Sequence, residues 1–466
     1  MADASISVFS IHKLTVKKFF EKRMLHQVEY PMPSRRLQPV PELSEITPAE
    51  MAARLQALEG IVFFDSARET DASISMLASN RGALIQGNLF NERDFLCLRE
   101  QVLRLTPPSA LPDDGLPRSI LGGTIDYDGT FEFAHYADIL IFSHREGRWY
   151  ASNPWWRELP LARASHPDPQ VARIHFTPTI SETDFCAWVA RVQEYIQSGD
   201  IYQANLSHRL EAFWPGGDPW SLYEALRHYS PAPYGAFLRQ TNRCVLSSSP
   251  ELFLQISGNT IRTRPIKGTR PRRADLHADE RSAFDLITSP KEVAELIMIT
   301  DLERNDLGQV CDWGSVTVSE MLKLERHEQV FHLVSTVDGR LRRDVDAATA
   351  LKACFPGGSI TGAPKKRARE VIDEIEPVPR GLYTGAIGWF GEGGESSFSI
   401  AIRTIIQEGQ ILHFHVGAGI VADSVPTQEW RETWDKAAGM LLAAQRVQDS
   451  MPIRVPSAIR FPADQY

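Results

Sequence analysis

Apolar residues recur along the chain at two spacings, one typical of amphipathic helices and one typical of buried strands. Phe185, Val189, Val192 and Ile196 follow one another at three or four positions, and this spacing predicts a helix over residues 181–198. A similar pattern predicts an earlier helix near residues 49–58. Short apolar runs without helical spacing predict strands at residues 60–64, 244–248, 251–256, 260–264 and 411–416.

Signals at helix ends place three further helices. Residues 289–292 (Ser-Pro-Lys-Glu) form a capping box with proline in the first turn, so a helix is expected from there to about residue 300. Another helix is expected after the loop 357–364 and before Pro377, because proline cannot continue a helix. Residues 417–419 (Gly-Ala-Gly) are expected to form a glycine-rich turn that leads into a long helix over about 427–447.

Prolines and turn residues suggest how the chain is divided. Residues 1–40 end in a proline cluster and are expected to be a flexible N-terminal extension. A proline-containing stretch near residues 166–178 is the expected boundary between a subdomain over 41–175 and a larger domain over 176–450. Residues 451–466 are expected to form a C-terminal tail.

Composition and charge restrict the class of protein. The 466 residues are 43% hydrophobic and 23% charged, which is ordinary for a globular protein with a large core. The net charge of −9 argues against nucleic acid or an anionic membrane surface as the main partner. No apolar run approaches the roughly 20 residues of a membrane helix. The first forty residues lack the features of a signal or transit peptide, so the expected location is the cytoplasm.

Two glycine-rich motifs resemble nucleotide-binding loops, but neither is complete. Residues 417–422 match the G-x-G-x-x-A dinucleotide fingerprint, yet Asp423-Ser424-Val425-Pro426 follows where a helix must start at once. Residues 357–362 begin like a phosphate loop, but Ala363-Pro364 replaces the required Lys-Ser/Thr pair. Dinucleotide binding and nucleotide hydrolysis are therefore not expected, although the second loop can still offer backbone N–H groups to an anion.

Several carboxylates stand in sequence positions that two interpretations can explain. Glu295 lies within an apolar stretch, so it either reaches solvent at the helix edge or is paired or bound to a metal ion. Glu429, Glu432 and Lys436 share one face of the last predicted helix, either as a solvated face with a Glu432–Lys436 pair or as part of a site. Mg²⁺ takes oxygen ligands and needs only one or two protein carboxylates, which Glu295 and Glu432 or Glu429 would supply.

Several longer segments are informative when they are taken together: 198–205 (SGDIYQAN), 249–253 (SPELF), 264–272 (RPIKGTRPR), 301–308 (DLERNDLG), 332–335 (HLVS), 355–365 (FPGGSITGAPK), 383–388 (YTGAIG), 402–404 (IRT) and 417–436. They resemble the chorismate-utilising enzymes, which include anthranilate synthase component I and the isochorismate synthases. The segments occur in the order seen in that family over about residues 180–450, whereas the N-terminal third resembles the family only through residues 63–67.

The resemblance implies an α+β fold, an anthranilate-synthase-like α/β/β/α sandwich with two large, mainly antiparallel sheets and the active site between them. It also implies that Glu295, Glu429 and Glu432 hold Mg²⁺ against the ring carboxylate of chorismate. Further residues that it assigns to substrate binding are Gly268, Thr269, His332, Thr361, Tyr383, Arg403, Gly417, Ala418, Gly419 and Lys436.

Two positions distinguish the reactions that members of this family catalyse. Isochorismate and salicylate synthases have a water-activating lysine where this chain has Gln203, and glutamine cannot act as a base at neutral pH. Lys267 stands where anthranilate synthases typically have alanine and where enzymes that aminate the para position have lysine. Taken without the family, Lys267 is one more solvated charge. The neighbouring cations Arg264, Arg270, Arg272 and Arg273 are expected to lower its pKa.

The implied reaction is covalent. Lys267 would attack C2 of chorismate while Glu251 protonates the departing 4-hydroxyl group, and ammonia would then enter at C4 and expel the lysine. None of the five cysteines, including Cys97 and Cys186, shows the glycine-rich elbow of a glutaminase, so a separate glutamine amidotransferase subunit is expected to supply the ammonia. Two alternatives remain open at this point: amination at the ortho position, and a non-catalytic chorismate-binding or regulatory paralogue.

Overall fold

Two antiparallel sheets dominate the fold. The computed structural model describes residues 37–66, 74–79, 81–105, 116–158, 174–327 and 330–448. The predicted extension over 1–40 lies almost entirely outside these residues, and the predicted tail over 451–466 lies outside them altogether. Every strand pairing in the described part is antiparallel, as the resemblance implied.

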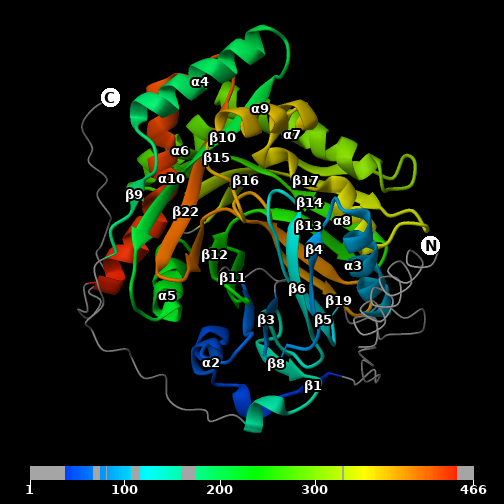
Figure 1. Ribbon diagram of the computed structural model, residues 1–466. Coiled ribbons are helices and arrows are strands. Elements are labelled where there is room, and N and C mark those ends of the chain that lie inside the picture. The colour runs from blue at the N-terminus through cyan, green and yellow to red at the C-terminus, as the bar shows by residue number, and fades with distance from the viewer. Residues whose placement is uncertain are drawn as a thin grey trace, which may run out of the picture. The chain divides into compact units, whose positions relative to one another are not determined.

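The first sheet has twelve strands (Figure 1). Their order is β1 (Gln38–Pro39), β8 (Arg148–Ala151), β7 (Leu140–Ser143), β3 (Ile74–Ala78), β2 (Val62–Asp65), β11 (Tyr234–Arg239), β12 (Cys244–Ser249), β21 (Thr404–Glu408), β22 (Ile411–Ile420), β10 (Gln203–Phe213) and β18 (Gly362–Ala363), with β9 (Thr177–Pro178) paired to β10.

The second sheet has ten strands. Their order is β15 (Ile266–Pro271), β17 (Val330–Arg340), β14 (Thr260–Arg264), β13 (Leu252–Ser257), β20 (Ser396–Ile400), β19 (Ala386–Gly391), β5 (Ile120–Ile125), β6 (Thr130–Tyr136) and β4 (Leu84–Asn88), with β16 (Thr317–Arg326) paired to β17.

Helices cover the outer faces of both sheets. The α-helices of the described part are α2 (Pro48–Leu55), α3 (Glu92–Leu105), α4 (Glu182–Gln197), α5 (Pro219–Tyr229), α6 (Leu276–Ile287), α7 (Pro290–Gly308), α8 (Ala347–Cys354), α9 (Lys365–Ile375) and α10 (Pro426–Gln448), and short 3₁₀ helices are η1 (Pro41–Leu43), η2 (Trp155–Glu158) and η3 (Gly358–Ile360). None of the described helices is both long and apolar enough to cross a membrane.

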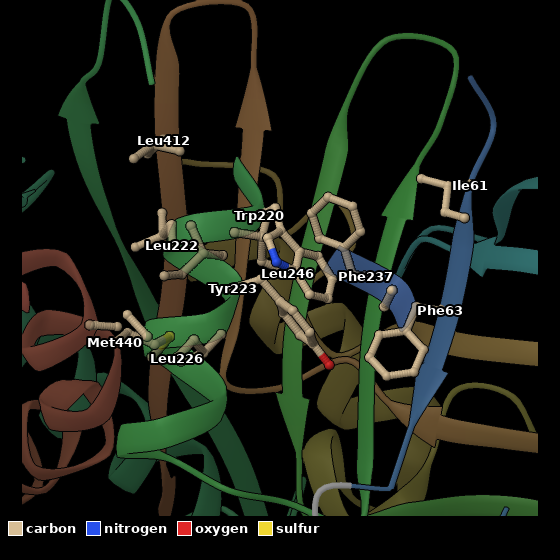
Figure 2. Close-up of a cluster of buried hydrophobic side chains, with 14 of the residues drawn as sticks. Ile61, Phe63, Trp220, Leu222, Tyr223, Leu226, Phe237, Leu246, Leu412 and Met440 are labelled. Atoms are coloured by element: carbon tan, nitrogen blue, oxygen red, sulfur yellow. The ribbon is translucent and has the colours of Figure 1, made fainter. Parts of the chain in front are cut away.

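Three apolar clusters define the layers. Between the sheets, Phe64 and Met76 of the first sheet share a core with Ile120 and Ile387 of the second. On the outer face of the first sheet, α5 and α10 pack against β12 and β22. Figure 2 shows this outer cluster, in which residues of α5 point toward the sheet and toward Met440 of α10. A third cluster places α3, α7 and α8 on the second sheet, so the predicted α/β/β/α sandwich is confirmed.

The described residues belong to one compact unit, and both sheets mix strands from before and after residue 175. In the first sheet β2 pairs with β11, so that Phe63 lies opposite Phe237. In the second sheet β5 pairs with β19, so that Thr124 lies opposite Ile387. Strands from both sides of the expected boundary near residues 166–178 are therefore paired within each sheet.

The local sequence signals agree with most elements. Ser181 is the N-cap of α4 and forms a capping box with Asp184. Ser289 caps α7, which runs to Gly308 rather than to about residue 300, because no proline interrupts the later turns.

A larger difference concerns the expected glycine-rich turn at residues 417–419. These glycines lie inside β22, which continues to Ile420, because their backbone pairs with β10 over its full length.

Candidate active site

The glycines of β22 are required by close packing at one end of the strand pair β10–β22. A Cβ atom on Gly417 would lie 2.8 Å from the Tyr383 hydroxyl oxygen, and one on Gly419 would lie 2.3 Å from Nε2 of Gln203. Both distances are too short for a side chain. Glycine is therefore needed at positions 417 and 419 because neighbouring groups leave no room for a side chain, and not because these residues form a dinucleotide-binding loop.

Glu295 is buried on α7. It therefore does not reach solvent at the helix edge, which was one of the two interpretations of its position in the sequence. Its side chain faces the strand pair, since its Oε2 would lie 3.8 Å from a Cβ on Gly419. Its Oε1 is buried without a hydrogen-bond partner, and burial raises the pKa of this carboxyl. A buried carboxylate oxygen without a partner is disfavoured unless a cation or donor binds it.

The two other carboxylates come from the first turns of α10. Glu429 is buried and accepts hydrogen bonds from Lys291 Nζ at 2.9 Å and Ser424 Oγ at 2.7 Å, but its Oε2 has no partner. Glu432 is half-buried and pairs with Lys436 at 2.7 Å, as the i,i+4 spacing predicted. Burial would raise the pKa of Glu432, but the Lys436 ammonium outweighs it and holds that pKa below its usual value.

Lys291 shows that the three carboxylates share one region. Burial alone would lower the pKa of the Lys291 ammonium, but Glu429, Glu432 and Glu295 together raise it. Among the described residues no three His, Cys, Asp or Glu side chains form a ready-made metal cage. The orphaned oxygens of Glu295 and Glu429 nevertheless fit Mg²⁺, because this ion needs one or two protein carboxylates and keeps several water ligands.

Lys267 points into the same region from β15. A bulge at Gly268, whose φ is +74°, interrupts the pairing of β15 with β17 between Lys267 and Thr269. The Lys267 amine donates to the carbonyl oxygen of Ser359 at 3.1 Å and lies 4.0 Å from Oε2 of Glu295. Only 14% of this side chain is exposed, so Lys267 is not a solvated surface charge.

Three of the arginines near Lys267 in sequence are held in ion pairs with carboxylates. Arg264 pairs with Glu325, Arg270 with Glu292 and Arg272 with Asp279. Each positive charge is thereby offset by a carboxylate of its own. The charged group that the structure places beside the Lys267 amine is instead the Glu295 carboxylate.

Glu251 is buried directly before β13 and lies close to Ser359 of η3. Burial raises the pKa of its carboxyl, although the neighbouring Ser359 hydroxyl and Lys267 ammonium oppose the rise. A carboxyl group that keeps its proton to higher pH is suited to act as a general acid. Ser359 thus lies between the candidate acid and the candidate nucleophile, with its carbonyl oxygen on Lys267.

The remaining predicted residues come from several elements. Lys436 Nζ donates to the Gly417 carbonyl oxygen at 2.9 Å, and Thr269 Oγ1 lies 3.0 Å from Nδ1 of His332. Tyr383 is buried against Gly417. Ala418 is in β22 but belongs to the outer apolar cluster with α4 and α9, so its side chain points away from the site.

Thr361 and Arg403 are held by backbone contacts. Thr361 Oγ1 donates to the Gly357 carbonyl oxygen at 3.0 Å, so its hydroxyl hydrogen is used within the loop. Arg403 has a φ of +50° between β20 and β21, and its carbonyl oxygen accepts the Ser248 N–H. A non-glycine residue in this left-handed region is strained and is often found at functional sites.

Several residues of the site had not been singled out from the sequence. Arg380 is buried and pairs with Glu376 at 2.8 Å, and it also donates to the carbonyl oxygens of Ile360 and Asn205. The i,i+4 spacing of Glu376 and Arg380 was a usable signal, but both residues follow the end of α9. Ser359 gave no signal beyond its place in a glycine-rich loop.

Comparison with known proteins identifies the family. Residues 122–442 match the sequence pattern of the chorismate binding enzyme family. The chain is 42% identical over 300 residues to aminodeoxychorismate synthase component 1 of Bacillus subtilis (strain 168), and the match covers 64% of this chain and 63% of that protein. It is 40% identical over 352 residues to an anthranilate synthase component 1 of Haloarcula marismortui, with 72% of this chain and 69% of that protein covered.

Solved structures give the same answer for the fold. Anthranilate synthase component I from Streptococcus pneumoniae TIGR4 superimposes with a TM-score of 0.69 at 28% identity, covering 80% of this chain and 93% of that chain. The menaquinone-specific isochorismate synthase from Escherichia coli reaches a TM-score of 0.74 over 93% of this chain, but at 19% identity it supports the fold alone. Since the family pattern spans more than half of its length, this chain belongs to the chorismate binding enzyme family.

Proposed function

We propose that the protein aminates chorismate at C4 with ammonia and forms 4-amino-4-deoxychorismate, a precursor of 4-aminobenzoate and folate. The position of Lys267 carries this proposal. Its amine is largely buried, contacts Ser359 of η3 and lies beside Glu295, between a candidate acid and a candidate metal site. A buried lysine that no carboxylate holds at hydrogen-bond distance is suited to be a nucleophile.

The covalent route follows from these positions. The neutral Lys267 nitrogen forms a bond to C2, both ring double bonds shift, and the C4–oxygen bond breaks while Glu251 gives its proton to the departing hydroxyl, which leaves as water. Ammonia then forms a bond to C4, both double bonds shift back, the C2–nitrogen bond to Lys267 breaks, and the new ammonium group returns a proton to Glu251. Chorismate and ammonia are thereby converted to the amino product and water, with both groups of the enzyme restored.

The other residues would hold the substrate dianion. Tyr383, Arg403 and the backbone of residues 417–419 are proposed to bind the enolpyruvyl carboxylate, for which the guanidinium is a planar, permanently charged partner. Thr269, His332 and Thr361 would line the ring, with Gly268 and Lys436. Mg²⁺, bound by Glu295 with Glu429 or Glu432, would neutralise and orient the ring carboxylate.

Two rival functions are weighed against this one. Anthranilate synthase component I, which aminates at the ortho position, is the closer rival because relatives of both kinds match the chain at about equal identity. The other rival is a non-catalytic paralogue. The proximity of Lys267 to both Glu251 and Glu295 argues against it. Water addition is disfavoured because Gln203, and not lysine, lies against Gly419.

Ammonia is proposed to come from a separate glutamine amidotransferase subunit. The two relatives described above are each named as the first component of a synthase, which supports a second component. The five cysteines of the chain are free thiols at separate places, and the described residues around Cys97 and Cys186 contain no glutaminase elbow.

The decisive experiment is intact-mass analysis of the protein mixed with chorismate and Mg²⁺ in the absence of ammonia. The proposal expects a covalent adduct of chorismate minus water on Lys267, absent from Lys267→Ala. Products formed with ammonium chloride are then treated with a lyase and identified by fluorescence. A main product of 2-aminobenzoate would overturn the proposal in favour of ortho amination, and no chorismate consumption at all would favour the non-catalytic paralogue.

A further inference from the structure

A buried ion pair between Glu376 and Arg380 joins four segments of the candidate site: β10, η3, the end of α9 and the turn before β19. Both residues follow α9, which packs beside β10 (Figure 1). Only 2% of the Arg380 side chain and 5% of the Glu376 side chain are exposed. The guanidinium donates to both carboxylate oxygens, from Nε and from Nη2, at 2.8 Å each. This two-point contact fixes the plane of the guanidinium as well as its position.

Every N–H group of the Arg380 guanidinium donates a hydrogen bond. Besides the two bonds to Glu376, Nη1 donates to the Ile360 carbonyl oxygen and to Thr384 Oγ1 at 3.2 Å each, and Nη2 donates to the Asn205 carbonyl oxygen. These bonds use all five N–H groups that a guanidinium has. Since the three further acceptors belong to η3, to the turn before β19 and to β10, one side chain connects segments that are far apart in the sequence.

Glu376 connects a second point of β10 to the same ion pair. Its Oε1 accepts hydrogen bonds from the Ser207 N–H at 2.7 Å and from Ser207 Oγ at 3.0 Å. In the pairing of β10 with β22, Ser207 lies opposite Gly417, and Asn205 lies opposite Gly419. The ion pair therefore holds β10 at the two positions that face these glycines, whose backbone is proposed to bind the enolpyruvyl carboxylate.

The other two acceptors of Arg380 stand next to residues that are proposed to bind the substrate. Ile360 precedes Thr361, and Thr384 follows Tyr383. Thr384 has a φ of +61°, which is a strained conformation that persists only where surrounding contacts hold it. Its Oγ1 accepts from Arg380 and donates to the Tyr383 carbonyl oxygen at 2.5 Å. Arg380 also contacts the Tyr383 ring, with Cζ 5.8 Å from the ring centre.

Stability alone does not account for this arrangement. Taking two charges out of water costs several kcal/mol per ion, so a buried ion pair contributes little to folding compared with apolar side chains of similar size. Burial would lower the pKa of the Arg380 guanidinium, but the Glu376 carboxylate outweighs it, and the guanidinium stays charged. What the pair supplies is geometry, because a rigid fork with five occupied donors leaves the joined segments little freedom to shift.

We infer that Arg380, held by Glu376, is a positioning residue for the part of the site that binds the enolpyruvyl carboxylate, an inference that rests on the proposed function. It sets where Tyr383, Thr361 and the glycines of β22 lie relative to one another. The enolpyruvyl carboxylate keeps its charge throughout the amination, so its contacts stabilise substrate and transition state alike. Loss of the positioning should therefore weaken chorismate binding and leave the rate of the chemical steps nearly unchanged.

Two variants and one control test this role. Glu376→Gln/Arg380→Met removes both charges together, so no unpaired charge stays buried, and the amide oxygen can still accept from Ser207. Arg380→Lys keeps a positive charge for Glu376, but an ammonium has three donors and lacks the planar fork. The matched control is Asp65→Asn/Arg227→Met, which removes another buried ion pair, 2.6 Å long, between β2 and α5.

Binding and turnover are measured separately. The Kd for chorismate is determined by isothermal titration calorimetry with Mg²⁺ and without ammonia, and here each substitution is placed in a Lys267→Ala parent so that no adduct forms. In proteins that keep Lys267, kcat and the KM for chorismate are determined with ammonium chloride as the nitrogen source. The Tm of each protein reports whether it is folded.

The expected result is a loss of affinity without a loss of rate. Glu376→Gln/Arg380→Met should raise the Kd and the KM for chorismate about tenfold or more, with kcat within about threefold of wild type. Arg380→Lys should fall between this variant and wild type, because it restores the ion pair but not all five hydrogen bonds. The control should keep the parent Kd even where its Tm falls as far as that of the double variant.

Three outcomes would contradict the positioning role: a Kd within twofold of the parent in the double variant, a kcat that falls as much as the KM rises, or an equal loss of affinity in the control. Should the double variant not fold, an unchanged Kd in Arg380→Lys would contradict it in the same way. Absence of the adduct in the wild-type protein would instead overturn the proposed function, and the comparison of Kd values, which needs no reaction, would still stand.

Discussion

The amine of Lys267 lies 4.0 Å from the carboxylate of Glu295, so the proposed nucleophile and a proposed metal ligand compensate each other's charge. The Lys267 amine also donates a hydrogen bond to the Ser359 carbonyl oxygen, and Glu295 Oε1 has no hydrogen-bond partner. A divalent cation bound to Glu295 would take over this compensation and leave Lys267 free to approach the substrate.

Substitution of Lys267 should remove most of the para amination. In Lys267→Ala the covalent route is lost, whereas the substrate-binding residues remain, so kcat should fall much more than the KM for chorismate rises. Product formation is measured by fluorescence after lyase treatment. Lys366→Ala removes an exposed lysine of α9 and should retain full activity. Full activity in Lys267→Ala would show that the lysine has only a structural role.

Substitution of Glu251 should change both the rate and its pH dependence. Glu251→Gln cannot give a proton to the leaving hydroxyl, and loss of a general acid lowers the rate by about 10²–10⁴-fold. Because burial raises the pKa of Glu251, the protonated form persists to higher pH than for an exposed glutamate. Adduct formation in the wild-type protein should decline as the pH rises through that raised pKa.

Stopped-flow measurement of chorismate loss across pH gives this profile. The declining limb should be missing in Glu251→Gln, which has no carboxyl to titrate. If both proteins show the same limb, the titrating group is not Glu251 and another acid must be sought.

The sequence was most informative where local chemistry decides structure. The helix over α4 and its N-cap Ser181 could be predicted because capping and apolar spacing act within a few residues. Glu295 could be singled out because a carboxylate in an apolar helix is unusual, and the structure buries it beside Lys267. The resemblance to the family extended this to the fold and to residues such as Tyr383, which no local pattern distinguishes.

Long-range pairing set the limits of prediction. Residues 417–419 have the composition of a turn, but pairing with β10 keeps them in a strand, and the partner strand is some two hundred residues away. The ion pair of Arg264 with Glu325 was not predicted for the same reason, since Glu325 lies on β16, far from Arg264 in the sequence. Ion-pair partners of this kind become visible only in three dimensions.

Mg²⁺ should stabilise the folded protein through Glu295 and the carboxylates of α10. A ligand present at a hundred times its Kd stabilises the folded state by about 2.7 kcal/mol, so added Mg²⁺ should raise the Tm and a chelator should reverse the rise. Glu295→Gln should abolish most of this shift, while Glu100→Gln on α3, which changes an exposed glutamate, should keep it. The Tm is measured by differential scanning fluorimetry. A Mg²⁺-dependent rise in Tm that is unchanged in Glu295→Gln would exclude Glu295 as a ligand.

Glu303 provides a prediction about stability that is independent of the metal. This glutamate is buried on α7, where its Oε2 accepts a hydrogen bond from Thr263 Oγ1 at 2.8 Å. Burial, and secondly the nearby Glu251 carboxylate, raise its pKa well above the usual value. The folded state therefore holds a proton that the unfolded state releases at about pH 4.3, so the free energy of unfolding falls as the pH rises above that value.

Glu303→Gln should therefore stabilise the protein at about pH 8 and leave its stability nearly unchanged at about pH 4, because glutamine is neutral at both values and its amide oxygen can still accept from Thr263. The comparison is made by Tm at a series of pH values, with Glu100→Gln as a control that changes only an exposed pair with Arg104. A difference in Tm that does not grow with pH would mean that the Glu303 carboxyl ionises normally in the folded protein. A Tm difference that grows with pH would instead identify Glu303 as a buried acid whose ionisation lowers the stability of the folded protein. This loss of stability would occur next to Glu251, the proposed general acid.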